Sequence, residues 1–243
     1  MYDFEGGENN MIEKYLRKVF LGSIAYFILN IKSLLIEKLS FVWSITVPLL
    51  VYYVNKEDIN SAKDLSFYWC YMIVSSYLFG LGIYAVEMRE SGCLKTIFSI
   101  NNSKMAYILG NIFTQLTYTL ICISIFNIYV MIDTEYAFLE MEKNALILML
   151  LCFPIGIGSY GFTLVKIFYV NSLKTLGTIL LFVGLMITGS NYRINAVNYL
   201  FIVPKILFGD STYYNTYLLM TIFLLCVGFI GINCFGPISR ERR

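Results

Sequence analysis

The sequence predicts an all-α integral membrane protein that crosses the bilayer six times. Of its 243 residues, 58% are hydrophobic and only 14% are charged, whereas a typical soluble domain is about 25% charged. Roughly half of the chain lies in six apolar runs, at Phe41–Val54, Phe67–Val86, Met105–Ile132, Ala145–Val165, Leu173–Thr188 and Tyr217–Phe235. A helix needs about 20 apolar residues to cross about 30 Å of hydrocarbon. Residues 1–243 are therefore predicted to form a single transmembrane domain.

The runs differ in length. The four runs in positions two, three, four and six reach the required length directly, and the first and fifth gain length from flanking residues 34–40 and 168–172. Pro48 lies within the first run and is expected to kink that helix, because it has no N–H for the backbone ladder. No acidic or basic residue lies in the middle of any run. This argues against a proton- or sodium-coupled carrier, which usually needs a buried ionisable group.

A surface helix is predicted before the first span, over residues 11–38. Its apolar residues recur at helical spacing, and its basic residues Lys14, Arg17 and Lys18 lie on another face. A basic amphipathic helix of this kind lies in the membrane surface rather than crossing it. Residues 1–10 are acidic and contain glycine, and we expect them to form a disordered tail.

Basic residues lie mainly on one side of the six-helix arrangement. With the N-terminus in the cytoplasm, 13 of the 18 Lys and Arg residues fall in cytoplasmic segments. Loops rich in Lys and Arg stay on the cytoplasmic side, so both termini are predicted to be cytoplasmic. Abundant Ile, Asn, Lys and Tyr with only four Pro favour a bacterial cell membrane as the location.

Two segments between the spans have apolar patterns of their own. After span two, residues 91–100 are predicted to form a short helix in which Leu94, Ile97 and Phe98 share one face. Between spans five and six, residues 197–208 are apolar but contain Pro204. About 12 residues are too few to cross the bilayer. This segment is therefore predicted to be re-entrant or interfacial on the outer face.

Several enzyme classes lack their characteristic residues in this sequence. There is no histidine, which removes Ser-His and Cys-His nucleophile pairs and imidazole metal sites. The six cysteines occur singly, so neither a zinc site nor a disulfide framework is indicated. Residues 158–161 read G-S-Y-G, but no base is present to activate the serine. We interpret them as small residues that let two helices approach closely.

A polar turn follows span two, where residues 87–95 read E-M-R-E-S-G-C-L-K. This turn resembles the E-R-E-x-G-[ST]-L-[KR] run that the permease subunits of type-2 ATP-binding-cassette exporters carry before their coupling helix. The surface helix, the proline-bearing first span and the re-entrant outer segment match the family in the same order. The resemblance covers nearly the whole chain. It departs at Cys93, where the family usually has Thr or Ser, and in the short first span.

The resemblance implies six helices per subunit, a second permease subunit that is identical or related, and a separate ATPase on the cytoplasmic face. The chain has no G-x-x-x-x-G-K-[ST] loop to hold ATP phosphates. It is therefore predicted to be a non-enzymatic transport subunit that binds no cofactor or metal, while ATP and Mg²⁺ bind to the partner ATPase. Membrane lipid is a further partner, and a net charge of +2 gives no reason to expect nucleic acid.

The resemblance also assigns roles to the polar turn and the helix that follows it. Leu94, Ile97 and Phe98 are expected to insert into an apolar groove of the ATPase, with Glu90 and Lys95 at its rim. The alternative is an ordinary interfacial helix that covers lipid headgroups. Because an isolated charge at a membrane boundary is costly, we further predict a gate ion pair between the polar turn and the surface helix. A plain interfacial charge cluster is the alternative, and the residues concerned are Arg17, Lys18, Glu87, Arg89 and Glu90.

The transport path is expected between two subunits, lined by spans two and five. Aromatic and hydroxyl side chains offer a broad surface to an amphipathic substrate, although ordinary helix packing also explains most of them. The candidates are Ser75, Ser76, Tyr77, Phe79, Tyr84, Thr175, Thr178, Thr188 and Asn191.

These features together predict ATP-driven export of an amphipathic substrate. An antimicrobial peptide, a drug or a lipid-like compound would fit, so peptide export and multidrug resistance are both within the prediction, and peptide export is preferred. The alternative is a membrane sensor or bacteriocin-immunity protein that binds a ligand and transports nothing. A membrane enzyme is disfavoured by the lack of histidine and of paired buried carboxylates.

Overall fold

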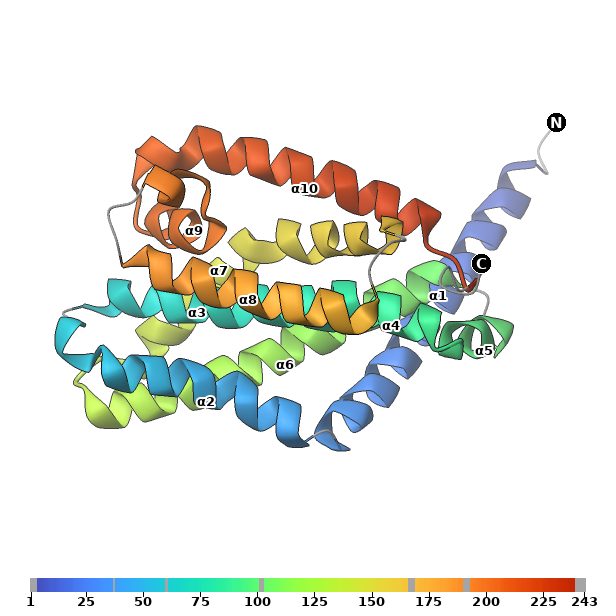
Figure 1. Ribbon diagram of the computed structural model, residues 1–243. Coiled ribbons are helices and arrows are strands. Elements are labelled where there is room, and N and C mark those ends of the chain that lie inside the picture. The colour runs from blue at the N-terminus through green and yellow to red at the C-terminus, as the bar shows by residue number, and fades with distance from the viewer. Residues whose placement is uncertain are drawn as a thin grey trace.

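The computed structural model is a bundle of helices (Figure 1). It describes residues 4–36, 38–59, 61–100, 103–165, 169–189 and 193–238, and over these ranges the chain forms helices and turns but no strand. This confirms the all-α fold class. The main helices are α1 (Phe4–Ile36), α2 (Lys38–Val54), α3 (Ala62–Tyr77), α4 (Tyr84–Glu90), α5 (Cys93–Ile100), α6 (Lys104–Asp133), α7 (Phe138–Gly158), α8 (Val170–Thr188), α9 (Tyr199–Leu207) and α10 (Tyr214–Cys234).

Five helical stretches are long and apolar enough to cross a membrane. They are Ala62–Glu90, Lys104–Asp133, Phe138–Leu164, Val170–Thr188 and Ser211–Cys234, and they contain the second to sixth apolar runs of the sequence. The first run lies in α2, whose 17 residues span about 26 Å at 1.5 Å per residue. The α2 helix packs along α6 and α3 (Figure 1). The structure thus supports five spans by length, and a crossing by α2 stays a prediction.

The second span is one continuous helix with a widened turn. The α3 helix passes into a π-helix, η2 (Leu78–Ile83), and then into α4. Two glycines let this turn approach its neighbours. A Cβ on Gly80 would overlap the Gln115 side chain, and one on Gly82 would lie 2.5 Å from the Ser159 carbonyl oxygen. Such π-turns inside α-helices are frequent at functional sites.

The fourth span ends in a tighter 3-10 segment, η3 (Ser159–Leu164), and α10 lies against both parts. The contact depends on glycine. A Cβ on Gly228 would overlap the Ile157 carbonyl group, and one on Gly231 would overlap that of Tyr160. On the opposite side, Gly158 and Gly161 face α10 side chains at close range. The interpretation of residues 158–161 as a close helix contact is therefore confirmed.

The α1 helix crosses the end of the bundle obliquely (Figure 1). It begins at Phe4, so residues 4–10, expected as part of a disordered tail, are helical. Its buried stripe faces α6, where a Cβ on Gly110 would lie 2.6 Å from the Tyr26 Cβ. Asn30 Nδ2 donates a 2.5 Å hydrogen bond to Asn111 Oδ1 at the same crossing. The position and the exposed apolar face of α1 fit a helix lying in the membrane surface.

The two short helices between spans lie at opposite ends of the bundle. The α5 helix is at the end that α1 crosses, and α9 is at the other (Figure 1). The α9 helix falls within the predicted segment 197–208 and packs against α3 and α7 through Leu200, Ile202 and Val203. With nine residues it is too short to cross. Its re-entry into the bilayer stays a prediction.

Candidate functional site

The polar turn after span two is anchored inside the protein rather than exposed on its surface. Arg89 and Glu90 have only 2% and 5% of their side-chain surface exposed, and Arg89 Nε lies 2.5 Å from Glu90 Oε1. Arg89 Nη1 also donates a 2.7 Å hydrogen bond to the carbonyl oxygen of Thr163 in η3. Two buried charges are tolerated when they are paired and hydrogen-bonded. Here the pair fastens the end of α4 to the end of the fourth span.

Local sequence explains why the chain turns at this point. Gly92 has a φ of +80°, a left-handed conformation that glycine adopts without steric cost. Its N–H donates to the Arg89 carbonyl oxygen at 3.1 Å, and the Ser91 N–H donates to that of Glu87 at 2.9 Å. This arrangement ends α4 at Glu90 and lets α5 start at Cys93 after two intervening residues, so the pair Arg89–Glu90 lies directly before the turn.

The contact continues from η3 into α10. Thr163 Oγ1 donates to the carbonyl oxygen of Tyr160 at 2.7 Å and lies 3.1 Å from that of Gly231 in α10. Lys104, the first residue of α6, donates from Nζ to the carbonyl oxygens of Ile232 (3.2 Å) and Asn233 (3.1 Å). A cation at the C-terminal carbonyl groups of a helix is favourable. The last turn of α10 is thus held by groups from η3 and α6.

A second ion pair joins α4 to α8. Lys174 Nζ donates to Glu87 Oε1 at 2.8 Å, and each side chain is a little over two-fifths exposed. An ion pair this exposed contributes little to stability. Its position matters more, because it lies where the second span meets the start of the fifth.

The predicted gate ion pair with the surface helix is wrong. Arg17 and Lys18 are exposed, and within the part of the chain that the structure describes neither forms an ion pair. The polar turn takes other partners, because α4 packs against η3 rather than against α1. The face of α1 that meets α6 is built from Val19, Ser23 and Asn30, which turns Arg17 and Lys18 outward.

The apolar face of α5 is also used within the chain. Leu94 is completely buried, and Ile97 and Phe98 pack against the core. The Phe98 ring meets Tyr107 and Phe235 edge-on, with centroids 6.0 and 6.4 Å apart. Leu94 is therefore covered by this chain and cannot enter an ATPase groove, whereas Ile97 and Phe98 are half-buried and their insertion stays a prediction. Of the expected rim residues, Lys95 is exposed and Glu90 is buried.

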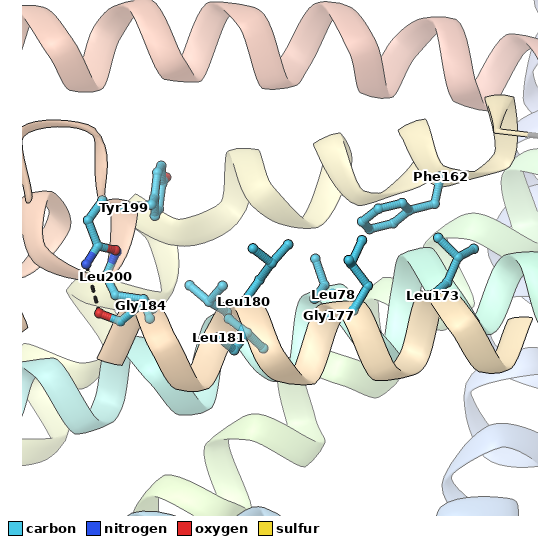
Figure 2. Close-up of a pocket in the computed structure, with 12 residues that line it drawn as sticks. Leu78, Phe162, Leu173, Gly177, Leu180, Leu181, Gly184, Tyr199 and Leu200 are labelled. Carbon is cyan, nitrogen blue, oxygen red and sulfur yellow. Dashed lines mark hydrogen bonds between the residues drawn. The ribbon is translucent and has the colours of Figure 1, made fainter. Parts of the chain in front are cut away.

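A cleft lies between the second and fifth spans within this chain, whereas the transport path is predicted between two subunits and stays a prediction. It has a volume of about 200 Å³, and Figure 2 shows its lining residues extending along α8, from Leu173 to Gly184 beside Tyr199. The lining is almost entirely apolar. It consists of Val74, Leu78, Phe162, Leu173, Leu176, Gly177, Leu180, Leu181, Gly184, Asn198, Tyr199 and Leu200.

The residues that line this cleft differ from the predicted path residues. Ser76 and Tyr77 are buried in the interior, where Ser76 Oγ bonds Gln115 Oε1 at 3.0 Å and Tyr77 OH donates to the Met149 carbonyl oxygen at 3.4 Å. Phe79 and Tyr84 are half-buried without lining the cleft. Asn191 lies outside the described residues.

The predicted hydroxyl side chains turn back onto their own helices. Ser75, Thr175, Thr178 and Thr188 each donate to a backbone carbonyl oxygen three or four residues earlier. This local hydrogen bond is a common alternative for Ser and Thr in apolar surroundings. None of these four side chains lines the cleft, which belongs to other faces of the same helices. The apolar i, i+3, i+4, i+7 stripe from Leu173 to Leu180 was the signal that marked the lining.

The two polar residues at the outer end of the cleft have their hydrogen bonds within the protein. Asn198 Nδ2 donates to the Gly184 carbonyl oxygen at 2.8 Å, and Asn198 Oδ1 accepts from the Leu200 N–H at 3.1 Å. Tyr199 OH donates to the Leu151 carbonyl oxygen at 3.0 Å. The cleft therefore offers an apolar surface without a free hydrogen-bonding group from these two side chains.

The described residues include no group of three or more His, Cys, Asp or Glu side chains arranged to hold a metal ion. Two buried thiols, Cys70 and Cys152, lie 3.9 Å apart between α3 and α7.

Comparisons with protein-family models, with curated proteins and with solved structures found no match to this chain.

Proposed function

We propose that this chain is the membrane-spanning permease subunit of an ATP-driven exporter in a bacterial cell membrane. Both termini lie in the cytoplasm, and a separate ATPase that binds ATP and Mg²⁺ docks on the cytoplasmic face. A second permease subunit, identical or related, completes the transporter. Its substrate is amphipathic, in the class of antimicrobial peptides, drugs and lipid-like compounds.

The observation that carries the proposal is the buried attachment of the polar turn. An exporter must convert movement at its cytoplasmic face into movement of its spans. Arg89 joins the turn to Thr163, and Thr163 in turn contacts Gly231 of α10. A displacement of the turn would therefore pull on the ends of the fourth and sixth apolar runs together, which an ordinary surface loop could not do.

The proposed docking surface is the outward face of α5. Its side chains are exposed while the opposite face is buried against Tyr107 and Phe235. Because the buried face fixes the helix rigidly, a partner that binds the outward face would move the whole turn. The residues of this face are Cys93, Lys95, Thr96, Ser99 and Ile100.

Co-purification and ATP hydrolysis test this proposal. The chain is tagged, expressed together with the genes that neighbour its own, and the purified protein is reconstituted into lipid vesicles. We expect one ATPase per permease, and ATP-dependent movement of substrate across the vesicle membrane. If the chain binds a ligand but no ATPase copurifies and nothing is transported, the protein is a sensor or immunity protein and the proposal is wrong.

A further inference from the structure

The chemistry of the cleft along α8 restricts what can occupy it. Ten of its twelve lining residues are apolar or glycine. The other two, Asn198 and Tyr199, hydrogen-bond through their side chains to backbone groups of the protein. No Asp, Glu, Lys or Arg is among the lining residues. A ligand that needs hydrogen bonds or charge pairing inside the cleft would lose its hydration there without replacement. The part of any occupant that enters the cleft is therefore apolar.

The shape of the cleft favours a chain over a compact ring. Its lining runs along α8 from Leu173 to Gly184 (Figure 2), a distance of about 16 Å at 1.5 Å per residue. Its volume of about 200 Å³ is of the same order as the roughly 150 Å³ apolar cavity that accepts benzene in another protein. A similar volume drawn out along a helix fits a stretch of alkyl chain.

The surroundings of the cleft identify the source of that chain. Leu176 and Leu180 line the cleft and are 47% and 63% exposed, so its mouth opens on the apolar outer surface of α8. In a bilayer, that surface meets lipid acyl chains.

One end of the cleft also has a cation. Lys174 follows Leu173 directly, and its ammonium group binds Glu87 while 43% of its side chain stays exposed. An ammonium group has three donors, so donors remain for a second anion. The Glu87 carboxylate balances the charge of Lys174, and the remaining N–H donors at this end suit the oxygens of a phosphate group.

We infer that the cleft holds one acyl chain of an anionic membrane phospholipid, with its phosphate beside Lys174. The lipid belongs to the leaflet on the side of α5, which the charge distribution places in the cytoplasm. Bound there, the chain lies along the lining residues of α8, while the contact of Gly177 with Leu78 of η2 closes the inner side of the cleft. This site is independent of whether the protein transports a substrate.

Photolabelling tests the inference directly. The full chain is reconstituted in nanodiscs that contain phosphatidylglycerol with a diazirine in one acyl chain, and labelled residues are mapped by mass spectrometry. We expect labelling of Leu78, Leu180 and Leu200 to exceed that of Leu219 and Phe223 several-fold, although these last two are 68% exposed on α10. Equal labelling of the two surfaces would mean that only ordinary boundary lipid is present, and would overturn the inference.

Variants of α8 provide matched controls. Leu180→Trp fills the cleft from an exposed position that tolerates a larger side chain, and it should reduce cleft labelling at least fivefold. Ile179→Trp changes a neighbouring exposed residue outside the cleft and should leave cleft labelling unchanged. A specific site is contradicted if both variants reduce cleft labelling equally, or if Leu180→Trp leaves it unchanged.

The phosphate contact has its own measurement. Lys174→Gln should abolish the preference of the cleft for labelled phosphatidylglycerol over labelled phosphatidylcholine, and Lys174→Arg should preserve it. Thermal unfolding of both variants controls for loss of the Glu87 ion pair. An unchanged preference in Lys174→Gln would overturn the placement of the headgroup.

Discussion

Arg89 Nη1 donates a hydrogen bond of 2.7 Å to the backbone carbonyl oxygen of Thr163, and both side chains are almost completely buried. The two residues are 74 positions apart in the chain. Their contact joins the polar turn after the second span to the end of the fourth, and Thr163 extends it to α10. The stability of this junction and of its neighbours, the membrane topology, and the proposed coupling to an ATPase can each be tested.

Arg89→Gln should lower the free energy of unfolding by about 3–5 kcal/mol, because it removes the guanidinium group from a buried ion pair with Glu90. Thermal unfolding in detergent measures the change. Lys95→Gln removes an exposed charge six residues away and should have little effect. Equal stability of these two variants would show that the buried pair does not hold the turn.

The outward face of α5 is expected to govern coupling to the ATPase. Thr96→Asp and Ile100→Asp place charge on the proposed docking surface, where Ile100 is 83% exposed, so they should abolish substrate-stimulated ATP hydrolysis without unfolding the chain. Hydrolysis by the reconstituted complex is the measurement. Leu94→Asp, by contrast, should unfold this end of the protein, because Leu94 is completely buried. Normal stimulation in both exposed variants would exclude this face as the docking surface.

The glycine contact between α10 and η3 predicts sensitivity to a single methyl group. Gly231→Ala should cost about 1–3 kcal/mol, because the added Cβ overlaps the Tyr160 carbonyl group and forces the helices apart. Gly189→Ala, at the end of α8, has no heavy atom within 4 Å of the added Cβ and serves as the control. Size-exclusion thermostability assays compare the two. A stable Gly231→Ala variant would mean that α10 can pack elsewhere.

The crossing of α1 over α6 should depend on Gly110. Gly110→Leu forces the Tyr26 and Ser23 segment of α1 away from α6. A loss of about 1–3 kcal/mol at the crossing raises the population of the open form by about fivefold to 150-fold. Trypsin should then cleave at Arg17 and Lys18 correspondingly faster. Phe113→Leu, which alters an exposed residue of the same helix, should not change the rate.

Native Cys93 reports the sidedness of the membrane topology. It is exposed at the start of α5, so a variant with the other five cysteines replaced by alanine should react with a membrane-impermeant maleimide only from the cytoplasmic side. Glu135→Cys in the same background should react only from outside. Labelling of Cys93 in intact cells would reverse the predicted orientation.

The sequence was most informative where the bilayer itself imposes a length. The runs at Leu173–Thr188 and Met105–Ile132 correspond closely to α8 and α6, because a span requires about 20 apolar residues in any fold. The interpretation of G-S-Y-G as a close contact is also confirmed. Small residues in a span commonly mark a place where two helices approach each other closely.

Which surface covers a given face could not be read from local spacing. The periodicity of Leu94, Ile97 and Phe98 marked an apolar face correctly, but a pattern of eight residues does not say whether its partner is another protein or Phe235 of the same chain. Arg89 was misassigned for a related reason. Besides Glu90, it binds a backbone carbonyl group of η3, and the residue types of a sequence do not indicate which backbone groups accept a hydrogen bond.

The π-helix η2 (Leu78–Ile83) affects how the second span responds to a change in its length. Such a turn holds about one residue more than an α turn. Deleting one residue between Leu78 and Ile83 would restore regular α winding and leave the residues beyond it on nearly the same faces, because the π-turn accommodates the additional residue. Arg89 would still face Thr163. A deletion in α4 before Arg89, where the winding is regular, would instead rotate the end of the helix by about 100° around its axis. The second span is therefore expected to tolerate a change in length at η2 and to lose the Arg89–Thr163 contact when the same change is made in α4.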